Sequence, residues 1–136
     1  MERPRCRAAF IDRGPIPLRE LALHPNWWVR RRVVVEGSLY KFPGNRISSG
    51  KVHDQLVCDR IDRFPPGGRG RYCLAFWGVR VQDMPGARRA PDRGWWVEEP
   101  IRLAGKLHGF PYPYATAERV GLAATGWRRG GRAAER

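Results

Sequence analysis

The chain has 136 residues and a formal net charge of +13, from 26 basic and 13 acidic side chains. Self-repulsion at this charge opposes compaction unless a polyanion or an acidic surface neutralises it, so the charge points to a class of partner. A hydrophobic fraction of 42% with six Trp excludes a wholly disordered chain. No apolar run approaches the length of a membrane span, and we expect one domain.

Arginine supplies 23 of the basic residues and lysine only 3, and two explanations compete. The planar guanidinium donates two parallel hydrogen bonds to a phosphate and stacks on aromatic rings. A GC-rich genome also enriches Arg, together with Ala, Gly and Pro, without selection for binding. Codon bias explains Arg in place of Lys better than it explains the excess of basic over acidic residues, so we expect the charge to serve binding.

The cysteines, Cys6, Cys58 and Cys73, are odd in number and lack a close pair, which does not indicate a disulfide framework. Cys58 and Cys73 fall in two adjacent predicted strands, where they are expected to be buried, reduced thiols. Without Cys-x-x-Cys or His-x-x-x-His pairs, zinc is disfavoured. Residues 1–10 are basic but lack the apolar stretch of a signal peptide. We therefore predict a soluble, cytoplasmic protein without metal or cofactor.

The N-terminal third is predicted to contain a basic arm, a short helix and a strand. Residues 1–15 form the arm, and residues 17–23 form one or two helical turns that end at His24-Pro25-Asn26. Leu18 and Leu21 share one side of that helix. The β-branched run that follows predicts a strand over 27–40, in which Gly37 marks a bulge or bend.

Three further strands are predicted. The strand at 51–61 places Val52, Leu56 and Cys58 on one face. Apolar residues on both faces make 71–82 a central strand. The strand at 95–103 should lie at an edge because Pro100 cannot donate to a ladder.

The connections and the C-terminus complete this prediction. Residues 64–70 and 83–94 are expected to be loops. Thr116 caps a short helix to Ala124, and residues 127–136 form a basic, disordered tail. The predicted fold is mainly β, with a single domain over 16–126. It is a small twisted antiparallel sheet or partly open barrel of the SH3 or OB kind, with four to five strands and short flanking helices.

The run Arg30, Arg31 and Arg32 is the first candidate binding site. In a strand, Arg30 and Arg32 share one face and can meet successive phosphates, while Trp28 stacks on a base. The alternative is that Trp27 and Trp28 anchor the core and the arginines form a solvated edge. The residues alone favour neither.

Other Arg-rich segments extend this hypothesis. Arg69 and Arg71 lie in a Gly-rich loop, and Arg88 and Arg89 lie in another. Together with the basic tail, they are predicted to form a rim around one binding face. Two further rings, Trp96 and Tyr112, are candidates for stacking on bases, although the segment 110–114 more often closes its own core.

Three functions follow from these patterns. The first is a non-catalytic nucleic-acid-binding module for RNA or DNA, working in a ribonucleoprotein or larger assembly. The second is a protein-interaction or inhibitor module, of the kind that phages and mobile elements encode, which binds an acidic surface of a partner protein. The third is a small metal-free nuclease, for which the available side chains are Lys51, His53, Asp54, Asp59 and His108. Their spacing supports no catalytic constellation, so no catalytic residue is assigned.

Overall fold

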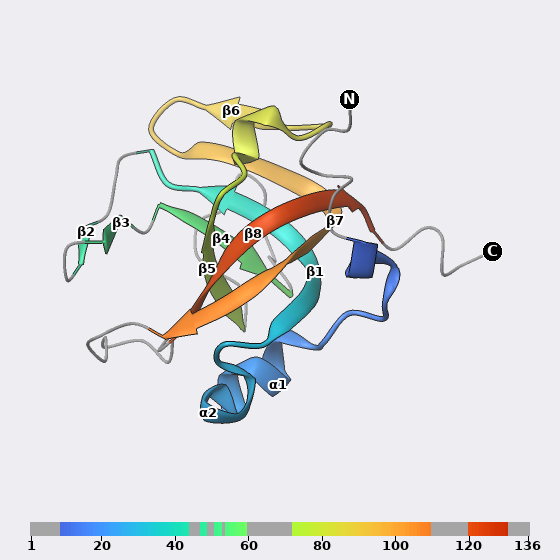
Figure 1. The fold of residues 1–136 in the computed structure, drawn as a ribbon. Coiled ribbons are helices and arrows are strands. Elements are labelled where there is room, and N and C mark those ends of the chain that lie inside the picture. Colours follow the sequence, from blue (N-terminus) through green and yellow to red (C-terminus); the bar gives the residue numbers. More distant parts are fainter. Residues whose placement is uncertain are drawn as a thin grey trace.

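The computed structural model describes residues 9–43, 47–48, 51–52, 54–59, 72–109 and 120–130. The fold is mainly β, as predicted (Figure 1). The helical elements are the 3-10 helix η2 (Ala9–Asp12), α1 (Leu18–Leu23), α2 (Pro25–Trp28) and the 3-10 helix η3 (Val81–Asp83). The strands are β1 (Arg32–Lys41), β2 (Ile47–Ser48), β3 (Lys51–Val52), β4 (Gln55–Cys58), β5 (Cys73–Trp77), β6 (Arg88–Ala90), β7 (Gly94–Gly109) and β8 (Val120–Arg129). None of the helices in this described part of the chain has the length and apolar character that a membrane crossing requires.

Five strands form a ring in the order β1-β4-β5-β8-β7, because β1 also pairs with β7. The chain runs through β1, β4 and β5 as antiparallel neighbours, and β7 then returns beside β1, which is a Greek-key connection. The last strand, β8, closes the ring between β5 and β7, parallel to β5. The prediction of an antiparallel sheet was wrong for this one pair. A five-stranded, partly open Greek-key ring agrees with the OB kind of barrel.

Local irregularities let β1 and β7 bend enough to close the ring. The β1–β7 register shifts between Gly37 and Leu39, and a Cβ atom at Gly37 would collide with the carbonyl oxygen of Cys58. The expected bulge at Gly37 is therefore confirmed. Pro100 lies in the same irregular stretch, where β7 needs no ladder hydrogen bond from it. That is why β7 continues through Pro100 as a central strand instead of ending at an edge.

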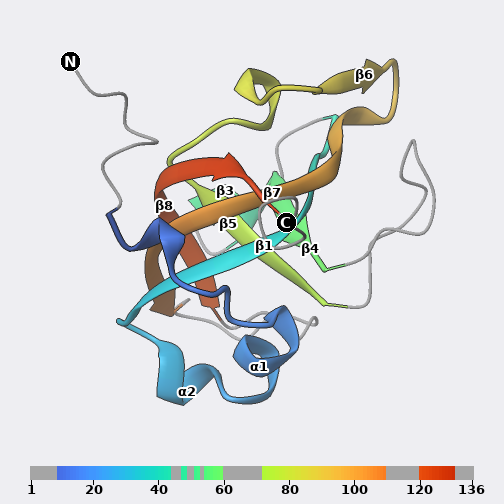
Figure 2. The ribbon, with the colours of Figure 1, turned by 90° about the vertical axis from the view of Figure 1, so that its right-hand side faces the viewer.

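The interior of the ring is filled by alternate residues of the strands, with α1 at one end of the ring and η3 at the other (Figures 1 and 2). Leu18 and Leu21 of α1 face this core, as predicted. The core residues with no exposed surface are Val35, Leu39, Val57, Val81, Leu103, Leu107 and Leu122. A second cluster, on the other face of the sheet, consists of Tyr40, Leu56, Cys58, Ala75 and Trp96. Strands β4 and β5 are thus buried on both faces.

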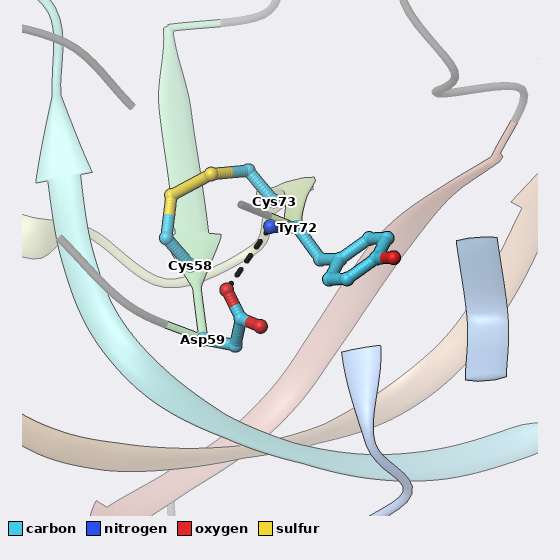
Figure 3. The surroundings of a disulfide bond; sticks show 4 residues. All are labelled: Cys58, Asp59, Tyr72 and Cys73. Atoms are coloured by element: carbon cyan, nitrogen blue, oxygen red, sulfur yellow. Dashed lines mark hydrogen bonds between the residues drawn. A yellow bond between two sulfur atoms is a disulfide. The ribbon is translucent and has the colours of Figure 1, made fainter. Parts of the chain in front are cut away.

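A disulfide joins Cys58 at the end of β4 to Cys73 at the start of β5 (Figure 3). The prediction of reduced thiols was wrong because the antiparallel register places these two residues directly opposite each other. Just beyond the bond, the backbone N–H of Tyr72 donates to Oδ1 of Asp59 over 3.0 Å, and the N–H of Asp59 donates to the carbonyl of Tyr72 over 3.0 Å. The disulfide and these hydrogen bonds hold the ends of the connection between β4 and β5 together.

The N-terminal half differs from the prediction in two places. Residues 9–12 form η2, and Ile11 is buried against Val34 and Ala104. Trp27 and Trp28 belong to the short helix α2, so the predicted start of the strand at Trp27 was wrong. Pro25 occupies the first turn of α2, where its fixed φ favours a helix and outweighs the β preference of the two indoles.

The C-terminal half differs more. The predicted loop at 83–94 contains the edge strand β6. The strand predicted at 71–82 ends at Trp77, and the strand predicted at 95–103 continues to Gly109. The predicted helix to Ala124 and the predicted tail from Trp127 were both wrong over 120–129, because these residues form β8. The remaining parts of both predictions, 116–119 and 131–136, lie outside the described residues. Ala and Leu suit a helix, but pairing with both β5 and β7 determines the strand.

Candidate functional site

An open groove of about 760 Å³ lies where α2 meets the start of β1. We call it the Trp27 groove, and its polar lining comes from Asn26, Arg30, Arg31 and His108. The Trp27 side chain is 60% exposed, unusually high for an indole. The guanidinium carbon of Arg31 lies 4.3 Å from the centroid of the Trp27 ring. Nε of Arg31 also donates a hydrogen bond to the Trp27 carbonyl over 2.6 Å. An accessible aromatic ring and a guanidinium are therefore held side by side.

Neighbouring contacts fix the position of the Trp27 groove. Trp28 packs against the core, and its ring N–H donates to Oε2 of Glu20 in α1 over 3.1 Å. The backbone N–H of Arg30 donates to the carbonyl of Leu107 over 2.7 Å, and the N–H of Leu107 donates to the carbonyl of Arg31 over 3.0 Å. These bonds attach the junction of α2 and β1, which we call the α2 corner, to β7. Trp28, which the sequence predicted to stack on a base, thus holds α2 against α1 and the core.

Arg30 has a left-handed backbone, with φ of 72°, and it lies before β1, not within it. The predicted sharing of one strand face by Arg30 and Arg32 was therefore wrong. A non-glycine residue in this region costs roughly 1–2 kcal/mol. Sparsely populated backbone conformations of this kind gather at functional sites, and here the chain keeps arginine at a position that glycine would occupy more easily.

This geometry gives a test of whether Arg30 is present for structure or for binding. Arg30→Gly should be more stable than Arg30→Ala by about 1 kcal/mol in urea unfolding, because only glycine adopts this φ without strain. Both variants should lose binding to an anionic ligand equally. If the alanine variant is as stable as the glycine variant, the left-handed conformation at Arg30 is not present in solution.

Positive charge in this part of the molecule is not neutralised within the described residues. Arg30, Arg31, Arg32 and Lys106 are all exposed there and form no ion pair with a described carboxylate. Several carboxylates of the described part are engaged elsewhere: Asp12 with Arg128, Glu36 with Arg102, and Asp54 with Lys41. The corner thus presents four cations to solvent.

A row of paired residues continues from this corner across the outer face of the ring. Arg32 of β1 is opposite Lys106 of β7, Lys106 is opposite Ala123 of β8, and Ala123 is opposite Trp77 of β5. We call these four residues the outer row. Residues directly opposite each other share one face of a sheet. The ring of His108 lies 6.0 Å from that of Trp77, across the intervening strand β8.

The second predicted basic patch lies elsewhere. Arg88 and Arg89 are exposed on β6, which is at the opposite end of the molecule from α2 in both views (Figures 1 and 2). The predicted rim around one face therefore does not include both groups. Arg69, Arg71 and Tyr112 lie outside the described residues.

The ring of Trp96, a predicted stacking group, is only 6% exposed and packs with Tyr40 in the second cluster. Burial raises the pKa of the Tyr40 phenol above its ordinary value of 10.0, and the positive charge of Arg93 lowers it in part. The phenol therefore stays neutral at physiological pH and adds no negative charge to this end.

The residues considered for a nuclease are not gathered into one described site. Asp54 is paired with Lys41 at one end of β1, whereas His108 lies beside the other end. Asp59 accepts the Tyr72 N–H. His53 and the Lys51 side chain lie outside what the structure describes.

Sequence patterns missed the two rings that border the cationic surface. Trp27 was interpreted only as a core anchor, and Trp77 only as part of a central strand. One signal for Trp27 was available: in a helical turn begun by Pro25, consecutive residues such as Trp27 and Trp28 point in different directions, so only one of them can face the core.

Comparisons with protein-family models, with curated proteins and with solved structures find no match to this chain. The fold is that of a small, partly open β ring with OB-like connectivity. Such a fold accommodates many functions, so function depends on the side chains of the site itself.

Proposed function

We propose that the chain is a non-catalytic nucleic-acid-binding module that contacts phosphates through Arg30, Arg31 and Arg32 and stacks a base on Trp27. The observation that supports this most is the exposed Trp27 ring beside cations that have no described carboxylate partner. Base–aromatic stacking and phosphate neutralisation are the two terms that dominate binding without sequence readout. The net charge of +13 adds long-range attraction for a polyanion. We further propose that the module works within a ribonucleoprotein or a larger assembly.

The test is fluorescence anisotropy with labelled single-stranded RNA, single-stranded DNA and duplex DNA across a salt series. Wild-type protein should bind with a steep negative salt slope that persists at physiological salt. Substitution of Arg30, Arg31 and Arg32 together by Ala should flatten that slope by about 2 for a single strand, at roughly 0.7 per phosphate contact. Trp27→Leu should weaken binding about tenfold with little change in slope.

The chain offers a matched control for the charge. Arg88, Arg89 and Arg93 are also exposed, and replacing all three by Ala removes the same net charge at the opposite end. This control should retain most of the wild-type affinity. Equal losses in the two triple variants would mean that only net charge matters, and the Trp27 groove would then not be the site.

The alternative function is binding to an acidic protein surface, for which Trp and Arg are also the favoured contact residues. It becomes the better explanation if no nucleic acid binds at physiological salt and a stoichiometric protein partner survives nuclease treatment in a pull-down. A small nuclease would require cleavage that is lost in His53→Ala or His108→Ala with binding retained.

The cytoplasmic location predicted from the sequence is also a proposal, and the Cys58–Cys73 disulfide opposes it. Disulfides persist in oxidising compartments and are rare in the cytosol. Alkylation of free thiols in intact cells, followed by mass spectrometry, decides the matter. A reduced pair supports the cytoplasm, and an oxidised pair supports an oxidising compartment.

A further inference from the structure

We propose that the ligand is single-stranded nucleic acid and that it crosses the outer row, from Trp27 in α2 to Trp77 on β5. Phosphates would lie over Arg32 and Lys106, and bases would stack at the two indoles. This inference rests on the proposed function and extends it from the Trp27 groove to a path over four strands.

The register determines the direction and length of this path. Arg32, Lys106, Ala123 and Trp77 belong to consecutive strands β1, β7, β8 and β5, so the row runs perpendicular to the strands. Neighbouring strands are about 4.8 Å apart, so the three intervals from Arg32 to Trp77 span roughly 14 Å along the curved surface of the ring. Trp27 extends the path beyond Arg32, because Arg31 joins the indole to the start of β1.

In the middle of the path, β8 contributes only small residues. Ala123 lies opposite Lys106, and Gly121 lies opposite His108. The rings of Trp77 and His108 approach to 6.0 Å across this strand. The small residues of β8 leave room for these two rings over that strand, and the rings together offer one aromatic surface on which a base can stack.

The chemistry of the row favours a single strand over a duplex. Stacking on an indole requires a base whose face is exposed, which a paired duplex does not provide. Small sheets that bind RNA hold two or three unstacked bases on their surface aromatics. Two indoles separated by cations suit a segment of that size, and Lys106 supplies a phosphate contact that the Trp27 groove alone lacks.

Trp77 lies outside the main core, so its substitution tests the path without opening a cavity there. It is only partly buried and does not belong to the side chains that pack on the main core. Trp77→Leu removes the flat aromatic ring but keeps an apolar side chain, whereas Trp77→Phe keeps a ring. Lys106→Ala has a matched control in Arg88→Ala, which removes one exposed charge at the opposite end.

The experiment measures anisotropy of labelled oligouridylate and oligothymidylate of three to ten nucleotides, and of a duplex, with unfolding temperatures recorded for every variant. We expect Trp77→Leu to weaken single-strand binding about tenfold, Trp77→Phe to restore most of it, and Lys106→Ala to reduce the salt slope by about 0.7. Duplex affinity should be lower than single-strand affinity and unaffected by Trp77→Leu.

The outcomes separate this inference from the proposed function. If wild-type protein binds single strands and Trp27→Leu weakens binding, but Trp77→Leu and Lys106→Ala change nothing, the path is wrong and the Trp27 groove stands. If duplex binds as tightly as single strands, the preference for a single strand is wrong. If nothing binds at physiological salt, both proposals fail and the surface serves a protein partner.

Discussion

Replacing Glu36 by Ala should lower the free energy of unfolding by about 3 kcal/mol. Oε1 of Glu36 accepts a hydrogen bond from Nε of Arg102 over 3.1 Å, and the Arg102 side chain is only 11% exposed. Removing one partner of a buried ion pair leaves the other charge without compensation, which costs about 3–5 kcal/mol. Partial exposure of Glu36 places the expected loss at the lower end of that range. Urea unfolding, followed by tryptophan fluorescence, measures it.

Glu36→Ala should also weaken the attachment of the N-terminal segment, because Arg102 contacts that segment as well. Its Nη1 donates to the carbonyls of Ile11 over 3.3 Å and Arg13 over 3.4 Å, so the same guanidinium holds the N-terminal segment against the sheet. We expect Glu36→Ala to increase amide exchange in that segment before global unfolding. Hydrogen-exchange mass spectrometry detects this local release.

Two control variants separate the contribution of charge from that of packing in the Glu36–Arg102 ion pair. Glu99→Ala removes an exposed carboxylate of β7 and should cost under about 0.5 kcal/mol. A double variant with Glu36→Leu and Arg102→Met should recover most of the stability lost in Glu36→Ala, because apolar residues of similar size replace the whole pair. An equal loss in Glu36→Ala and Glu99→Ala would contradict the buried pair.

Reduction of the Cys58–Cys73 bond should also lower the free energy of unfolding by about 3 kcal/mol. The bond joins residues 15 positions apart, and closing a loop of that length restricts the unfolded chain by about this amount. Wild-type protein should therefore unfold at a lower urea concentration when a reductant is present. The double variant with Cys58→Ala and Cys73→Ala should be destabilised to a similar degree and should not respond to reductant.

Cys6 supplies the control for the disulfide. Cys6→Ser should unfold like the wild type in both the presence and absence of reductant, and should still show the mass loss of one disulfide. If the double cysteine variant keeps wild-type stability without reductant, the bond makes no net contribution to folding. Binding to nucleic acid should persist in the reduced protein, because the outer row does not depend on either cysteine.

The sequence predicted the elements that depend on neighbouring residues. It did not predict the elements whose conformation depends on pairing with distant strands. The α1 helix, the bulge at Gly37 and the double burial of β5 follow from proline placement, glycine and alternation, which neighbouring residues determine. The strand β8 could not be predicted in this way, because its conformation depends on β5 and β7. The disulfide was missed for a similar reason, since sequence spacing gives no register between two strands.

The candidate site was predicted in composition but not in geometry. The run of three arginines does lie at an exposed corner, as the sequence indicated, but Arg30 is left-handed and outside the strand. Which of two adjacent indoles is exposed depends on the bond from Trp28 to Glu20, which links α2 to α1. The grouping of Trp77, Lys106 and Arg32 requires the order of strands in the ring, which the sequence does not specify.

The pairing of β1 with β7 has a consequence for how the chain folds. Arg32 and Lys106 are partners in that pair although 106 − 32 = 74 positions separate them. Contacts between residues so distant in sequence slow the search for the native state, because the entropy of closing a long loop is lost before many contacts form. During synthesis, the apolar face of β1 emerges well before its β7 partner exists. The strong positive charge of the chain then has a second benefit, since mutual repulsion between nascent molecules limits aggregation until β7 arrives.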